Sequence, residues 1–272
     1  MMEIILFKTA MAVYLVCAIV YAASLWVRRV LTARVATWLM LVALCIHTLS
    51  FAFHWITTGA SPVIGLHDAL SFFAWVLAAV YLALQLKTKT RVLGAFVSPM
   101  VFLIMVGSSV KLGVVVGAPA FLQGSLVTVH VMLAVTGEAL FVLASCAGLM
   151  YLVQDDMIKR KKKGSLIRLF PSLRDLDRIN HLCLIWGFPL LTLGVLAGSL
   201  WARIVWGSHW QWDTKQVWTL LAWIFYGFLL HQRLVVGWQG RKAAFWSLVV
   251  FFSLAIMLIL GKQLFPSVHQ FV

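Results

Sequence analysis

The sequence predicts an all-α membrane protein, a bundle of about eight transmembrane helices that forms one domain over residues 1–272. Hydrophobic residues make up 63% of the 272 positions and charged residues 11%, with a mean hydropathy of +0.99. This chain is more apolar than a soluble domain. Its apolar runs are long and uninterrupted, which favours helices over a barrel, because each backbone amide in lipid must be paired inside the protein.

Eight segments are long enough to cross a hydrocarbon layer of about 30 Å at about 1.5 Å per residue. They are residues 5–27, 35–57, 67–86, 92–110, 125–152, 180–204, 217–235 and 243–264. The first could be mistaken for a signal peptide, but its positive cluster, Arg28, Arg29 and Arg34, follows the apolar run. We therefore expect a transmembrane helix whose N-terminus is external.

The basic residues test this layout, because cytoplasmic loops of membrane proteins collect Lys and Arg. Seventeen of the 22 fall in alternate loops: Arg28, Arg29, Arg34, Lys87, Lys89, Arg91, Lys159, Arg160, Lys161, Lys162, Lys163, Arg168, Arg174, Arg178, Arg233, Arg241 and Lys242. Both termini are therefore predicted to be external, in a multi-pass protein of the inner (cytoplasmic) membrane. The charge of +14 reflects orientation and contact with membrane lipid, and it indicates no nucleic acid.

The longest polar stretch, residues 154–178, is predicted to be a basic cytoplasmic loop. It suits a docking site for anionic lipid or a protein partner, or, as the simpler interpretation, an orientation signal. The four cysteines lie inside apolar runs, with no CxxC pair and no CxxCH motif. This pattern argues against covalently attached haem and against a disulfide framework.

Tryptophans crowd the external segment 206–218, which reads WGSHWQWDTKQVW. Isolated tryptophans are common at any membrane interface. Four of them within thirteen residues, with Asp213 and Lys215 among them, instead indicate an apolar surface with polar groups set into it. Such a surface suits a large planar ligand with a few charged groups, and haem fits this description. Candidate partners for its propionates are Lys215 and, after it, Arg203, Lys111 and Lys262.

Haem iron also needs axial ligands at the same membrane level. His130 lies near the external start of the fifth span and His269 follows the eighth, so both fall on the tryptophan side. Either one alone is more typical of a structural histidine. Together with the tryptophan segment, they indicate a pair of ligands.

Several motifs resemble those of the haem-handling superfamily that contains CcsA, ResC, CcmC, CcmF and HemX. Segment 206–218 is similar to its WWD signature, WGxxWxWDxKExW, and residues 187–202 resemble the helix that leads into it. Residues 231–233 and 237–241 resemble the following helix end, and residues 267–270 the terminal histidine motif. The resemblance covers about one hundred residues, 173–271, and extends more loosely to the helix of His130.

The resemblance implies that haem b binds Trp206, Trp210, Trp212, Asp213, Lys215 and Trp218, with His130 and His269 as iron ligands. It also implies a second, intramembrane haem site at His231. The best partner for His231 in this chain is His47, with His54 as second choice. Thr214 and Gln216 replace the family's usual Pro and Glu, which weakens the inference of full haem-lyase activity more than that of haem binding.

Other polar residues support smaller expectations. His67 and Asp68 are expected to be structural, with Asp68 near a helix N-terminus, and His181 and His209 are expected not to be ligands. Glu138 should face the bundle interior, where it could line a haem path, because an intramembrane carboxylate needs a partner.

The leading function implied by the resemblance is CcsA/ResC-like: binding haem and presenting or exporting it for cytochrome c biogenesis, as the haem-handling part of a haem lyase complex. Its expected partners are a ResB/CcsB-like membrane protein and apocytochrome c. The alternative is a HemX-like membrane regulator of the level of a haem-biosynthesis enzyme. A transporter of an unrelated solute would use Glu138 and His47 and leave the tryptophans without a role.

Overall fold

The computed structural model describes residues 2–27, 30–58, 66–88, 90–110, 124–161, 170–210, 212 and 214–264, without the side chains of residues 30, 58, 66, 87, 88, 214 and 257–264. These ranges form eight α-helices, one short 3-10 helix and no strand, which confirms the all-α prediction. The α-helices are α1 (Met2–Val27), α2 (Val30–Thr58), α3 (Leu66–Thr88), α4 (Gly94–Ser109), α5 (Ser125–Lys159), α7 (Leu173–Trp206), α8 (Thr214–Leu234) and α9 (Gly240–Leu264), and η1 is Arg91–Leu93.

Six of these helices are long and apolar enough to cross a membrane: α1 to α5, with η1 leading into α4, and α7. Two further predicted spans, α8 and α9, form helices at the expected positions but fall outside this set. Helix α8 falls outside because both of its ends are polar. Its first turn contains Lys215 and Gln216, and its last turn contains His231, Gln232 and Arg233. In α9 the described side chains stop at Ile256. The chain is thus a multi-pass helical membrane protein.

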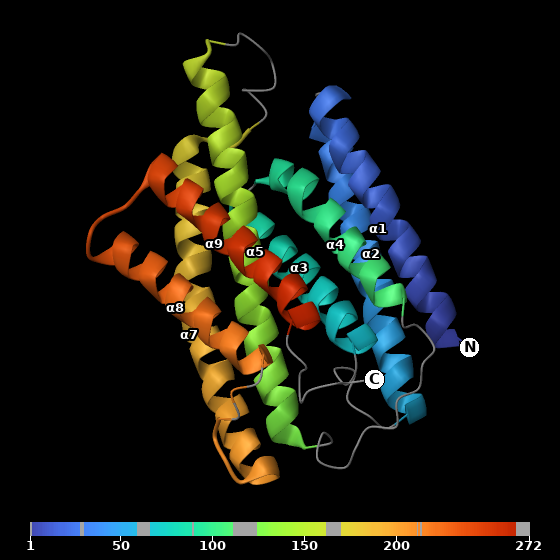
Figure 1. Ribbon diagram of the computed structural model, residues 1–272. Helices are drawn as coiled ribbons and strands as arrows, with labels where there is room; N and C mark the ends of the chain where they lie inside the picture. The colour runs from blue at the N-terminus through green and yellow to red at the C-terminus, as the bar shows by residue number, and fades with distance from the viewer. Residues whose placement is uncertain are drawn as a thin grey trace. The chain divides into compact units, whose positions relative to one another are not determined.

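The helices divide into two compact units, and the single domain expected over residues 1–272 stays a prediction. The first unit contains residues 1–118 and 153–175, and the second contains residues 119–152 and 176–272. Figure 1 shows α1 and α2 side by side in the first unit, and α5 alongside α7 in the second. Each unit has its own core. Tyr14, Tyr21 and Tyr81 are fully buried in the first, while Phe141 and Leu143 are buried in the second.

The predicted basic loop, residues 154–178, is shorter than the sequence suggested, because helices occupy both of its ends. Ion pairs one helical turn apart extend α5, with Lys159 bonded to Asp155 at 2.9 Å and Arg160 to Asp156 at 2.8 Å. A reciprocal cap begins α7. The backbone N–H of Asp175 donates to Ser172 Oγ, and this hydroxyl donates to the Asp175 carboxylate.

Close backbone packing joins α5 to α7 in the second unit. A Cβ atom added at Gly137 would lie 2.9 Å from the backbone oxygen of Gly187, and one added at Gly194 would lie 2.8 Å from the backbone nitrogen of Ala134. Small residues allow this approach, as in many membrane helix pairs. The four cysteines are all free, and all except Cys45 are buried.

Candidate functional site

The tryptophan segment lies between α7 and α8 and is fixed to α7 where that helix ends. Gly207, with a φ of 72°, donates its N–H to the carbonyl of Arg203 at 2.9 Å. This is a common way to end a helix, because glycine adopts positive φ without strain. The ring of Trp206 then packs edge-to-face on the buried Trp201, with ring centres 5.0 Å apart. We call this end of the second unit the tryptophan end.

Two more indoles form a second edge-to-face pair, Trp210 and Trp212, with ring centres 5.6 Å apart and planes at 81°. The rings of both pairs are thus close to perpendicular, so the apolar surface expected from the sequence is not flat here. A planar ligand could stack on one ring of a pair and meet the edge of the other. The indole N–H of Trp210 is buried and has no hydrogen-bond partner among the described residues.

Trp212 is unusual in two respects. It is 76% exposed, and its backbone φ of 53° lies in the left-handed region that side chains rarely adopt. An L-residue in this region costs about 1–2 kcal/mol relative to ordinary backbone. Strained residues of this kind concentrate at ligand sites.

Trp218 and Trp223 have a different role, because their N–H groups are used within the second unit. Trp218 donates to the carbonyl of Leu254 in α9 at 3.0 Å, and Trp223 donates to the Thr192 hydroxyl in α7 at 2.9 Å. These bonds tie α8 to both neighbouring helices. Trp218, which the sequence placed in the haem surface, therefore also anchors the start of α8.

His130 on α5 lies against α7 beside this segment. Its Nδ1 is 2.7 Å from the carbonyl oxygen of Gly194. Because a carbonyl only accepts hydrogen bonds, Nδ1 carries the proton, and Nε2 of the neutral ring has the lone pair that metals bind. Metal-bound histidines are commonly oriented by a hydrogen bond of this type.

Glycine at position 198 makes room for the His130 ring. A Cβ atom there would lie 2.6 Å from His130 Cε1 and 2.7 Å from Nδ1. Gly198 is one turn before Trp201, so His130 is placed at the tryptophan end, as the sequence predicted. Gly194 and Gly198 were not predicted as site residues, although a spacing of four residues between glycines is a known signal for close helix contact.

Arg203 and His209 lie together at the tryptophan end. Arg203 NH1 is 3.3 Å from His209 Nε2, and His209 Nδ1 is 3.3 Å from both the hydroxyl and the carbonyl of Ser199. Arg203, His209 and Lys215 are all exposed. His209, expected to be a non-ligand, is thus beside Arg203, whose role as a propionate partner stays a prediction. Lys111 and the side chain of Lys262 lie outside the described residues.

His231 lies in the last turn of α8, at the opposite end of the second unit, and is exposed. Of the eight histidines, seven are described. His231 is the only one of these seven whose ring makes no hydrogen bond to another described residue. The imidazole is therefore available to an external ligand, as its proposed role requires.

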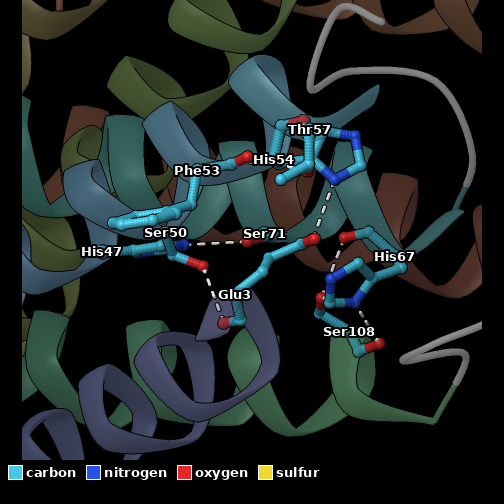
Figure 2. Close-up of polar contacts among 9 residues, drawn as sticks. All are labelled: Glu3, His47, Ser50, Phe53, His54, Thr57, His67, Ser71 and Ser108. Carbon is cyan, nitrogen blue, oxygen red and sulfur yellow. Dashed lines mark hydrogen bonds and ion pairs between the residues drawn. The ribbon is translucent and has the colours of Figure 1, made fainter. Parts of the chain in front are cut away.

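His47 lies in the first unit and is fully buried. Figure 2 shows its bond to Ser71, with Nε2 2.8 Å from the hydroxyl. Phe51 stacks on the ring at 4.8 Å, and Phe7 and Tyr14 contact it edge-on. The other nitrogen, Nδ1, has no partner among the described residues. Because His47 and His231 belong to different units, their pairing stays a prediction.

The remaining polar groups of Figure 2 are paired with one another. His54 Nδ1 is 2.8 Å from the carboxylate of Glu3, and His67 Nδ1 is 2.9 Å from the carbonyl of Ser108, whose hydroxyl donates to the His67 carbonyl. The bond between His67 and Ser108 ties α3 to α4, which agrees with the structural role expected for His67.

Two predicted haem contacts, His269 and Asp213, lie outside the described residues. Glu138, expected to face the interior, is half-buried on α5, and no hydrogen bond joins its carboxyl group to another described residue. The sharing of one iron by His130 and His269 stays a prediction.

These features define a class: a polytopic helical membrane protein with a tryptophan-rich loop packed beside an oriented histidine. The family profile described as cytochrome C assembly protein matches residues 63–269. The chain belongs to this family.

Individual relatives agree with the family match. The cytochrome c biogenesis protein CcsA of Trieres chinensis is 30% identical over 249 residues, covering 80% of each chain. The CcsA of Chlorella vulgaris is 29% identical, with 82% of each chain covered. That of Synechococcus elongatus is 29% identical, covering 72% of this chain and 74% of the relative. The family and its relatives support a role in cytochrome c biogenesis.

Proposed function

We propose that the chain binds haem b as cargo at the tryptophan end of the second unit and presents it to apocytochrome c at the external face of the membrane. The orientation of His130 is the observation that carries this proposal. Its Nδ1 donates to the Gly194 carbonyl, so Nε2 carries the lone pair of the type that binds metals, and the ring lies against Gly198, one helical turn before Trp201.

The tryptophan segment supports the proposal with an exposed ring and a buried donor. Trp212 offers an exposed indole face on which a macrocycle can stack. The N–H of Trp210, which has no partner among the described residues, offers a donor for a propionate oxygen. Arg203, with His209 beside it, and Lys215 supply positive charge for the propionates.

His269 is the second iron ligand in this proposal, and the vinyl edge of haem stays open to the cysteines of the apocytochrome. The protein contributes ligation and orientation, while the bond-forming chemistry belongs to haem and the incoming thiols. A ResB/CcsB-like membrane protein completes the haem lyase complex. A second haem site, in the membrane, uses His231 with His47. No observation favours the HemX-like alternative.

Absorption spectra of the purified full-length protein test the proposal. We expect the parent to show haem bands that His130→Ala and His269→Ala remove, because each loses an axial ligand. His231→Ala should leave the bands of this site in place. His67→Ala is the control, because His67 bonds Ser108 within the first unit and is expected to be structural. Unchanged spectra in the variants at positions 130 and 269 would remove the ligand assignment.

Trp212→Asn is expected to change fold stability and haem binding in opposite directions. Asparagine tolerates left-handed backbone better than tryptophan does. The haem-free variant should therefore be more stable than the haem-free parent by roughly 1 kcal/mol and melt at a higher temperature. Haem should bind more weakly, because the stacking face is lost. Differential scanning fluorimetry and haem titration measure the two effects.

Trp38→Asn is the matched control for Trp212→Asn. Trp38 is also exposed but lies in the regular helix α2 of the first unit. Its replacement should leave haem affinity unchanged. Parental haem affinity in Trp212→Asn would contradict a role for this indole in binding.

A further inference from the structure

Arg233 is the most thoroughly bonded charged side chain described at the end of the second unit opposite the tryptophan end. Its side chain is only 3% exposed, and it lies two residues after His231. Its Nε donates to His181 Nδ1 at 3.1 Å, and one terminal nitrogen donates to Asn180 Oδ1 at 2.8 Å. The other terminal nitrogen donates to both the carboxylate and the carbonyl of Asp177, at 3.0 and 3.2 Å. All three partners lie near the start of α7.

The same carboxylate also binds the beginning of α9. Oδ1 of Asp177 accepts the backbone N–H of Gly240 at 2.9 Å, where α9 starts. A carboxylate at a helix N-terminus is favourable, because it meets unpaired N–H groups and the positive end of the helix dipole. Asp177 therefore joins the ends of α8 and α9 to α7.

Asn180 extends this network to α5. Its side-chain amide donates to the carbonyl of Ala144 at 2.8 Å and to the Ser247 hydroxyl at 2.9 Å. The turn after α8 is held as well, with the N–H of Trp238 bonded to the carbonyl of Gln232 at 2.9 Å. The four helices of the second unit thus meet at one polar network around Arg233.

The network leaves His231 on the other face of α8. Two residues are about 200° apart around a helix at 3.6 residues per turn. With the Arg233 side chain held against α7, the imidazole of His231 points away from the network, and it is exposed and makes no hydrogen bond to another described residue. Rotation of α8 about its axis would break the Arg233 bonds and turn His231 at the same time.

We infer that Arg233 is a positioning residue. It fixes the rotation of the α8 end and thereby orients the His231 imidazole toward the haem iron. This inference rests on the proposed role of His231 in the inner haem site. The planar, multiply bonding guanidinium suits this purpose better than an ammonium group, since it makes several directed bonds at once. Asp177 acts with it by neutralising its charge and holding α9.

The first test needs no haem. A nitroxide spin label at His231→Cys, in a Cys45→Ala background that removes the exposed native thiol, reports how firmly the α8 end is held. We expect a restricted spectrum with Arg233 present and a mobile component with Arg233→Ala or Arg233→Lys. Asp177→Asn, a milder change, should show the same component more weakly. Identical spectra in all of these proteins would overturn the inference, whatever the outcome for haem.

The second test uses haem-loaded protein. Haem affinity at the site that His231→Ala removes should fall at least about tenfold in Arg233→Ala, measured by titration and absorbance, as for other residues that orient metal-binding histidines. The bands that depend on His130 should persist. Lys242→Ala is the control, because it removes a positive charge near the same turn, where Lys242 lies 4.0 Å from the Trp238 ring centre. It should leave both sets of bands unchanged.

Rescue by imidazole separates positioning from a direct contact with haem. Free imidazole should restore the lost bands in His231→Gly, and equally in the double variant with Arg233→Ala, because a diffusing ligand needs no aiming by α8. Failure of rescue only in the double variant would overturn the inference. One outcome separates the two proposals: the spin label becomes mobile in Arg233→Ala, but His231→Ala leaves the haem spectrum unchanged. Arg233 then positions the end of α8, and the proposal of an inner haem site at His231 is wrong.

Discussion

Gly198→Ala is expected to weaken haem binding at the His130 site by about 10–100-fold while the protein keeps its fold. The new methyl group would lie 2.6 Å from Cε1 of His130, a separation that real Cβ atoms essentially never show. The ring must therefore move, and it loses the 2.7 Å bond to the Gly194 carbonyl that fixes its tautomer and direction. Losing such an orienting bond typically lowers metal affinity by about this factor. Titration of haem into haem-free protein, followed by absorbance, measures the change.

Gly107→Ala is the matched control for this prediction. Gly107 also lies inside an apolar helix, α4, but the nearest atom to an added Cβ is 3.8 Å away, an ordinary contact. Both substitutions favour the helix by up to about 1 kcal/mol, so neither should prevent folding. Only Gly198→Ala should change the dissociation constant. A parental value in that variant would show that the glycine does not position His130.

The helices could be predicted from the sequence because lipid leaves the backbone few alternatives. The residues at which the helices begin and end were harder to predict. The predicted loop 154–178 is partly helical, although its sequence contains the responsible signals, the Asp155 and Lys159 pair and the Ser172 and Asp175 cap. Each adds only about 0.3–1 kcal/mol, which is small beside the apolar signal that sets the spans.

The residue types of the candidate site could be predicted, but their partners could not. His130 is oriented by a backbone carbonyl, and every residue has one, so no side chain in the sequence marks Gly194 as the acceptor. The left-handed backbone of Trp212 is equally hidden, because tryptophan gives no signal for it. The near-perpendicular indole pairs arise from tertiary packing, which spacing along the chain does not encode.

His47→Leu is expected to remove the inner haem site and, at the same time, to leave haem-free protein as stable as the parent or more stable. An axial ligand is lost, so the haem bands assigned to that site should disappear. Stability should not fall, because the buried Nδ1 of His47, which has no partner among the described residues, costs about 1–3 kcal/mol, and the Ser71 hydroxyl that loses Nε2 can bond a backbone carbonyl of its own helix. Leucine has a similar volume and suits the aromatic surroundings of Phe7, Tyr14 and Phe51. Melting curves and absorption spectra together test this prediction.

Ser71→Ala gives the matched comparison, because it removes the partner of Nε2 and leaves His47 in place. This variant should melt lower than the parent, since both ring nitrogens are then buried without a described partner. If replacing His47 costs no stability but removes haem, the role of His47 is to bind haem and not to stabilise the fold. If His47→Leu instead melts lower and keeps all of its haem, His47 has a purely structural role, and His231 must pair with another ligand.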